Sequence, residues 1–259
     1  MYLKVDGAEI YYEVHGEGEP VFFLNGLLGN PQMWKKYQLS NFESEYKCVF
    51  HCFRGQEFSR VSKPFLIEDL VDDLDQLIEA IGFNQVNLCG DAFGAGIILR
   101  YLIKHPHKVN KAIIGVFPTF PDKVAFLTIK SWFEVLQKTD LETMFHVMLP
   151  DLFGKDFLIE IQNELDDIMG MFIGEKNKSD YLQLFESLFN RKSAIEYGDI
   201  ETPVLIVQGE NDRFITKQHG LNAKQIIPNS KYIEMKAGHV PLMEQPDVYA
   251  DIVKRFLQG

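Results

Sequence analysis

The segment Gly90–Gly94, with the sequence GDAFG, constrains the fold of this chain more than any other. Residues 85–89 before it have the pattern of a short buried strand, and residues 95–102 after it that of an amphipathic helix. A strand, a tight turn and a helix are the context of the G-x-S-x-G nucleophile elbow, whose central residue is held in a strained turn. Glycine is needed on both sides, because side chains there would clash with the crossing strand and helix. At the serine position of this motif stands Ala92, whose methyl group can neither attack nor leave.

Two further segments place an acid and a histidine after apolar strand patterns. The pattern at 204–208 is followed by Glu210 and Asp212, and the pattern at 231–235 by His239 in a Gly-His loop. The order along the chain is nucleophile position, acid and histidine, as in α/β-hydrolases and not as in the other serine-hydrolase folds. On these motifs the chain resembles the α/β-hydrolase superfamily over nearly its whole length. The spacing typical of that family favours Asp212 over Glu210 as the acid.

The resemblance and the element pattern together predict an α/β fold. Strand patterns alternate with helix patterns, which indicates a mostly parallel, twisted sheet of about eight strands with helices on both faces and an antiparallel hairpin at its start. We expect residues 1–116 and 198–259 to form the α/β-hydrolase core. Residues 117–197 break the alternation and are expected to be an all-helical cap inserted between two core strands.

The resemblance also implies a role for each residue of the site. In a working triad, a hydroxyl at position 92 would attack a carbonyl and His239 would take its proton, while Asp212 would hold the imidazole in the required tautomer. The backbone N–H groups of Leu27 and Phe93 would form the oxyanion hole.

Three further features lie near this site, and one of them departs from the family pattern. Residues 24–29 match the family's His-Gly loop with Asn25 in place of His, a mild departure because the oxyanion donor is backbone and the Asn25 amide can still hydrogen-bond the loop. The turn 54–56 (Arg-Gly-Gln) resembles an Arg-Gly turn of many relatives, and we interpret it as structural. Asp91, next to the elbow tip, is expected to point away from the site.

The composition of the chain argues against several classes of function. The net charge of −11 argues against nucleic-acid binding, and no stretch has the length and apolarity of a membrane span. The N-terminus lacks the pattern of a signal peptide. Cys48, Cys52 and Cys89 indicate buried thiols in a reducing, cytoplasmic compartment, and a replacement nucleophile among them is the less favoured interpretation. The sequence contains no metal motif or phosphate loop, so we expect no metal or other cofactor. We also expect the protein to be a monomer or a homodimer.

The predicted cap is rich in Phe and Met, and it carries helical periodicity in four segments: Val124–Lys138, Leu141–Leu149, Phe157–Met169 and Tyr181–Phe189. Most of these side chains are expected to pack within the cap, and some to line the gap above the elbow. Flat Phe and adaptable Met suggest a small-molecule substrate with an apolar portion. The candidate substrate-binding residues are Asn25, Leu28, Trp132, Phe145, Met148 and Val240.

Ala92 leaves three hypotheses. The first, which we favour, is a serine hydrolase of a small apolar ester, thioester or lactone, inactivated by Ser→Ala at this position, because everything around the site is conventional. The second is a natural pseudo-hydrolase that binds a ligand, although the retention of Asp212 and His239 argues against it. The third is a His-Asp dyad enzyme, such as a lyase or cofactor-free oxygenase, that does not need the serine.

Overall fold

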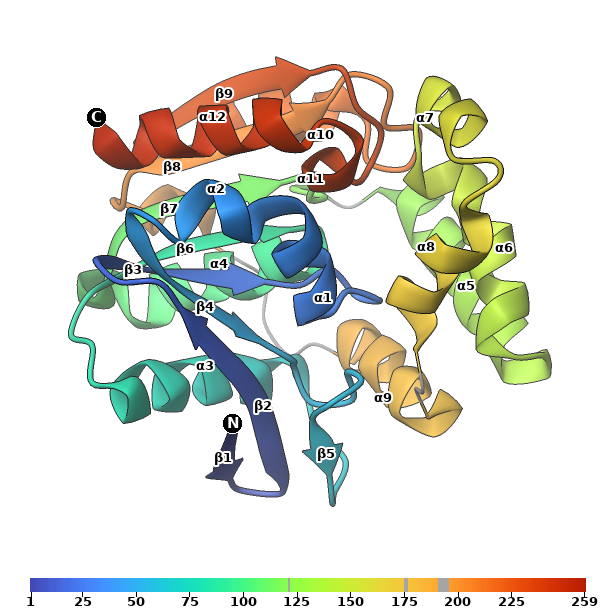
Figure 1. The fold of residues 1–259 in the computed structure, drawn as a ribbon, viewed down its shortest axis with the longest axis horizontal. Helices are drawn as coiled ribbons and strands as arrows, with labels where there is room; N and C mark the ends of the chain where they lie inside the picture. The colour runs from blue at the N-terminus through green and yellow to red at the C-terminus, as the bar shows by residue number, and fades with distance from the viewer. Residues whose placement is uncertain (121, 175–176, 191–195) are drawn as a thin grey trace.

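The computed structural model describes residues 1–120, 122–174, 177–190 and 196–259, and it contains one mixed sheet (Figure 1). The path of the sheet is β1-β2-β4-β3-β6-β7-β8-β9, and β5 pairs with β2 off this path. Strand β2 pairs antiparallel with β1, β4 and β5. All pairs along the path from β4 to β9 are parallel. The strands are β1 (Tyr2–Val5), β2 (Ala8–His15), β3 (Glu19–Leu24), β4 (Tyr46–His51), β5 (Arg60–Val61), β6 (Val86–Asp91), β7 (Val109–Gly115), β8 (Val204–Gly209) and β9 (Ser230–Met235).

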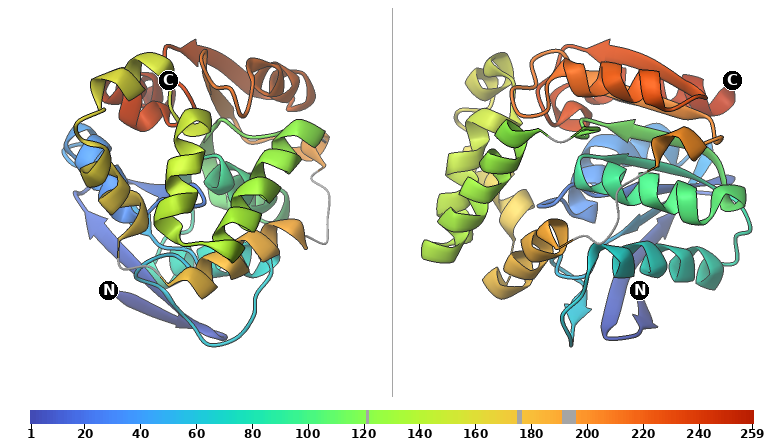
Figure 2. Two further views of the ribbon diagram at one scale, coloured as in Figure 1. Left: turned by 90° about the vertical axis from the view of Figure 1, so that its right-hand side faces the viewer. Right: turned by 180° about the vertical axis from the view of Figure 1, so that it is seen from behind.

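Helices cover both faces of the sheet (Figure 2), as the alternating pattern predicts. One group of helical segments packs around α12 on one face of the sheet. A second group lies on the other face, where α4 packs on β6 and β7, α10 packs on β8 and β9, and α3 packs beside α4. The first group is α1 (Pro31–Trp34), η1 (Lys35–Leu39), α2 (Ser40–Phe42), α11 (Pro241–Glu244) and α12 (Pro246–Gln258). The second is α3 (Ile67–Ile81), α4 (Phe93–Lys104) and α10 (Lys217–Ile226). The mostly parallel α/β architecture expected from the sequence is therefore confirmed.

Five helices lie together beside the ends of the parallel strands (Figures 1 and 2). They are α5 (Lys123–Lys138), α6 (Leu141–Leu152), α7 (Lys155–Glu160), α8 (Leu165–Ile173) and α9 (Lys178–Phe189), and we call them the α5–α9 layer. The carboxyl ends of parallel strands are where ligands bind in open α/β sheets. This arrangement places the α5–α9 layer over the edge of the sheet that carries the elbow.

One predicted helix differs from the structure. The segment Phe157–Met169 forms parts of α7 and α8, because the chain turns after Ile161, where the Glu164 N–H donates to the Ile161 carbonyl at 2.8 Å. Residues 34–39 are divided between the end of α1 and the π-helical η1. The two-residue strand β5 is too short to leave a periodic pattern in the sequence.

Candidate active site

The elbow lies between β6 and α4, with Ala92 at its tip. Ala92 has φ 51° and ψ −110°, a conformation that costs about 1–3 kcal/mol for a residue other than glycine. Its N–H donates to the Gly115 carbonyl at 2.9 Å, which ties the tip to β7. A Cβ added at Gly90 would lie 2.9 Å from the Cβ of Leu24, and one at Gly94 would lie 2.6 Å from the Leu24 carbonyl oxygen. The strained turn and the two small residues are as the sequence predicts.

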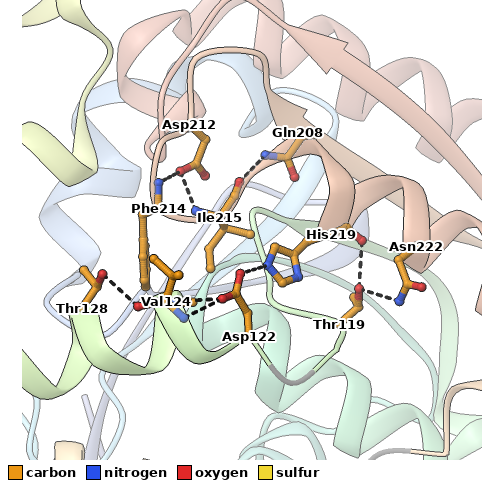
Figure 3. A network of polar contacts seen from close by, with 11 residues as sticks. Thr119, Asp122, Val124, Thr128, Gln208, Asp212, Phe214, Ile215, His219 and Asn222 are labelled. Atoms are coloured by element: carbon orange, nitrogen blue, oxygen red, sulfur yellow. Dashed lines mark hydrogen bonds and ion pairs between the residues drawn. The ribbon is translucent and has the colours of Figure 1, made fainter.

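His239 and Asp212 are brought together from two loops at the same edge. The His239 Nδ1 atom lies 2.8 Å from the Asp212 Oδ2 atom, and both residues are buried. The other oxygen, Oδ1, accepts hydrogen bonds from the N–H groups of Phe214 (2.9 Å) and Ile215 (2.8 Å), as Figure 3 shows. A carboxylate on Nδ1 makes that nitrogen the donor and leaves Nε2 as an acceptor, which is the tautomer of a general base. Glu210 is exposed and stands apart from this pair.

Glu244 organises the loop that carries His239, a role that sequence reasoning missed. Its carboxylate accepts backbone hydrogen bonds from Gly238 at 2.8 Å, Gly154 at 3.1 Å and Val240 at 3.3 Å. Burial raises the pKa of Glu244 above its ordinary value, although these three donors oppose the rise. One sequence signal was available, namely an acid within an otherwise apolar stretch, five residues after the Gly-His loop. Glu244 links the His239 loop to the end of the α6–α7 connection.

The candidate oxyanion hole is held by Gln56. The Gln56 amide donates to the carbonyls of Gly26 (2.8 Å) and Leu27 (3.2 Å), and its Oε1 accepts from the Asn25 amide at 3.1 Å. No hydrogen bond joins the N–H of Leu27 or Phe93 to another described residue, so both donors can serve a ligand oxygen. The turn 54–56, interpreted from the sequence as structural, therefore supports the loop that carries a candidate catalytic donor.

A cavity of about 130 Å³ lies between the elbow, the two loops and the α5–α9 layer. Nearly all of its wall is apolar, and Ala92 and His239 are part of it. Four of the six candidate substrate-binding residues line it: Leu28, Trp132, Met148 and Val240.

The other two candidates lie outside the wall of this cavity. The Asn25 side chain points away from it and donates to the His51 carbonyl at 2.6 Å, because the amide is used to fix its own loop. Phe145 is fully buried within the α5–α9 layer, 5.1 Å between ring centroids from Phe172, which lines the cavity in its place.

A row of aromatic contacts connects the α5–α9 layer to the imidazole. The ring centroid of Phe214 lies 4.8 Å from that of Trp132 on α5 and 4.9 Å from that of His239. The Phe214 ring therefore contacts both the imidazole and the layer above it. Its backbone N–H also binds Asp212, so one residue contacts the base, the acid and the roof of the cavity.

A buried carboxyl group lies directly below the elbow tip. Asp91 accepts a hydrogen bond from the Tyr249 hydroxyl at 3.3 Å, and its Oδ2 has no partner among the described residues. Burial raises the pKa of Asp91 to about 7, and the nearby His239 opposes this rise. Burial also raises the pKa of the Cys89 thiol well above its ordinary range, so this cysteine is protonated and unreactive at neutral pH.

A second His-Asp contact fastens α5 to the core (Figure 3). The His219 Nε2 atom on α10 lies 3.0 Å from Oδ2 of Asp122, and the other oxygen of that carboxylate accepts from Val124 N at 2.7 Å. The His219 ring is stacked on Phe120, and its carbonyl accepts from the hydroxyl of Thr119 at 2.8 Å. The connection from β7 to α5 is thus tied to α10, which follows the Asp212 loop in the chain.

Within the described ranges, no group of three or more His, Cys, Asp and Glu side chains is placed to hold a metal ion. The same part of the chain contains no helix with the length and apolarity that crossing a membrane requires. The groups that the protein itself brings to the site are a buried imidazole, two backbone donors and an apolar wall.

Comparisons with known proteins agree with the fold. The model of the Ndr family matches residues 53–259. The chain is 19% identical over 258 residues to pyrrolizixenacetamide deacetylase from Xenorhabdus hominickii, covering 98% of this chain and 97% of that protein. The enol-lactonase from Burkholderia xenovorans LB400 superposes with a TM-score of 0.90 at 21% identity, covering all of both chains. An alpha/beta hydrolase enzyme from a Medee basin deep-sea metagenome library superposes with a TM-score of 0.91 at 18% identity, covering 100% of this chain and 98% of that one. These similarities confirm the α/β-hydrolase fold.

Proposed function

The chain belongs to the Ndr family and has the α/β-hydrolase fold, and from this premise we propose that its site is that of a serine hydrolase whose nucleophile position is held by Ala92. The proposed ligand is a small apolar ester, thioester or lactone. The observation that carries the proposal is the buried contact between His239 and Asp212, with 2.8 Å between Nδ1 and Oδ2, at the wall of an apolar cavity whose floor is the strained elbow.

The geometry supports acyl transfer in every part except the attacking group. A hydroxyl on residue 92 would give its proton to Nε2 of His239 and attack the carbonyl carbon, and Asp212 would stabilise the resulting imidazolium. The oxyanion would lie between the N–H groups of Leu27 and Phe93, each worth ~10²–10³ in rate where such a hole operates. His239 would then return the proton to the leaving group. With a methyl group at position 92, the same site binds the compound and no acyl group is transferred to this position.

We also propose that residues 117–197 act as the cap of this site, with residues 1–116 and 198–259 as its core. The contact between Trp132 and Phe214 supports this division, because it places α5 directly above the base. A reducing, cytoplasmic location is proposed as well, because Cys48, Cys52 and Cys89 are all buried and none forms a disulfide. Two similar proteins, named as a deacetylase and an enol-lactonase, support the choice of acyl compounds as substrates.

The test compares the Ala92 protein with the Ala92→Ser variant on esters, thioesters and lactones of increasing acyl length. Loss of the nucleophile in such a triad costs ~10⁶ in kcat, so a gain of several orders of magnitude is expected in the serine form. The double variant Ala92→Ser/His239→Ala is the matched control and should lose that gain. A serine form that stays inert on the whole panel contradicts the proposal.

Two other outcomes assign the site differently. Turnover by the Ala92 protein that disappears in His239→Ala would identify a His-Asp dyad enzyme. Binding of the compounds with no turnover in either form would identify a ligand-binding protein. Ala92→Gly is the control for these measurements, because it changes the tip of the elbow and supplies no nucleophile.

A further inference from the structure

A second, larger cavity adjoins the one above the elbow. Its volume is about 720 Å³, and it lies between α4, the connection from β7 to α5, and helices α5 and α9. The two cavities share five wall residues: Phe93, Phe117, Pro118, Ile129 and Leu188. They are therefore neighbouring chambers that share a wall of side chains.

The wall of the second chamber contains several aromatic rings. Six of its described wall residues are aromatic: Phe93, Phe117, Phe120, Phe126, Phe189 and Tyr197. The polar wall residues are Arg100, Thr119, Asp122 and Lys123. Asp122 binds His219 and the start of α5, the hydroxyl of Thr119 donates to the His219 carbonyl, and the Arg100 guanidinium donates to the Gly96 carbonyl. Aromatic pairs gain energy beyond their buried area in edge-to-face and offset arrangements. This wall therefore favours a flat ring over a flexible chain.

The boundary lies at the reacting position. Phe93 supplies a candidate oxyanion donor through its backbone, and its side chain lines both chambers. A Cβ added at Gly96 would lie 2.7 Å from a ring carbon of Phe117, so the glycine lets this ring approach α4 closely. A carbonyl group held by the candidate oxyanion donors would therefore lie next to both chambers.

Building on the proposed function, we propose that the compound recognised has a flat aromatic substituent, which occupies the second chamber. The other substituent of its carbonyl group is compact and aliphatic and occupies the chamber of about 130 Å³ above the elbow. The two chambers differ in volume and in wall chemistry, and this difference determines which chamber each substituent enters. The substrate class is accordingly an ester or thioester that joins a short aliphatic group to an aromatic one.

The experiment uses isothermal titration of the Ala92 protein with three butanoate esters. Ethyl butanoate offers only a two-carbon group to the second chamber, octyl butanoate offers a flexible chain, and 2-naphthyl butanoate offers two fused rings. The naphthyl ester should bind at least about tenfold more tightly than the octyl ester, because the rings stack on several aromatic side chains. Equal or tighter binding of the octyl ester overturns the inference.

Phe126→Ala and Leu127→Ala provide a matched pair of variants. The two residues are adjacent on α5 and similarly exposed, at 50% and 52%, so neither substitution opens a hole in the core. Phe126 lines the second chamber, whereas Leu127 lines neither. Phe126→Ala should weaken binding of the naphthyl ester about three- to tenfold and leave ethyl butanoate unchanged, as expected for one aromatic contact. Leu127→Ala should change neither, and equal effects of the two variants contradict the assignment of the second chamber.

The failure of this inference can be told apart from the failure of the proposed function. If none of the three esters binds and Ala92→Ser hydrolyses none of them, both the proposed function and this inference fall. If the esters bind, or the serine form hydrolyses them, without preference for the aromatic ester, only the assignment of the second chamber is wrong.

Discussion

The Nε2 atom of His219 lies 3.0 Å from Oδ2 of Asp122, and this contact joins core helix α10 to the start of α5. The His219 side chain is fully buried, while that of Asp122 is partly exposed. The hydrogen bond of Asp122 to His219 lowers the pKa of this carboxyl below its ordinary value, so it is ionised at neutral pH. Because α5 also carries Trp132, this contact helps to fix the roof of the cavity over His239.

We expect Asp122→Ala to be more damaging than Asp122→Asn. Asparagine can still accept from Val124 N and cap α5, whereas alanine loses both the cap, worth about 1 kcal/mol, and the contact with His219. Urea unfolding measures the difference in free energy, and hydrogen exchange over residues 116–138 shows whether α5 loosens. His107→Asn is the control, because His107 is exposed. Equal stability of the two Asp122 variants would show that capping contributes nothing.

Ala92→Gly should stabilise the protein by about 1 kcal/mol, because glycine adopts a positive φ without strain. Ala95→Gly, three residues later in α4, should have the opposite sign and cost about 1 kcal/mol, since its backbone is helical. Thermal unfolding of both variants measures the two shifts. A loss of stability in Ala92→Gly would mean that the elbow tip is unstrained.

Gln56→Leu should destabilise the protein by about 3 kcal/mol, because it leaves the Asn25 amide and two loop carbonyls without their buried partner. In the Ala92→Ser background, kcat should fall more than KM rises, since the oxyanion donor of Leu27 loses its support. Gln76→Leu on the exposed side of α3 is the control and should change neither stability nor rate. An unchanged kcat in Gln56→Leu would contradict a role in positioning.

The buried carboxyl of Asp91 should make stability fall as pH rises. Its pKa is about 7 in the folded protein and 3.8 ordinarily, so between these values the folded state binds more protons than the unfolded state. The stabilising contribution is complete below about pH 4 and is lost as pH approaches 7, at a cost on the order of a few kcal/mol. Asp91→Asn should remove this part of the slope when unfolding is measured from pH 4.5 to 8. An identical slope in the variant would show that Asp91 is ionised throughout.

The elbow and the His-Asp pair could be predicted from the sequence. Strand-turn-helix context and two glycines locate the elbow, and the spacing after β8 and β9 locates Asp212 and His239. These features depend on local patterns and chain order, both of which can be read from one sequence. Leu28, Trp132, Met148 and Val240 were identified by their place in the family pattern or by apolar character, and they line the cavity in the structure.

Residues that act through long-range hydrogen bonds could not be found in this way. Glu244 binds Gly154, 90 residues away, and Gln56 binds Asn25, 31 residues away, so neither contact leaves a periodic signal. The choice between Phe145 and Phe172 for the wall of the cavity depends on which face of each helix meets the elbow. The sequences of α6 and α8, which are both rich in apolar residues, do not indicate how each helix is rotated about its axis.

The conformation of residue 92 is imposed entirely by its surroundings: the close contacts of Gly90 and Gly94 with β3 and the hydrogen bond from its N–H to Gly115. None of these involves the side chain at position 92. Alanine and serine codons of the GCN and TCN type differ by a single base, so one point mutation exchanges the two residues with no rearrangement of the fold. In evolutionary terms, a lineage carrying this architecture can lose or regain the proposed attacking group in one step, while the proposed base, the candidate oxyanion donors and both chambers remain in place.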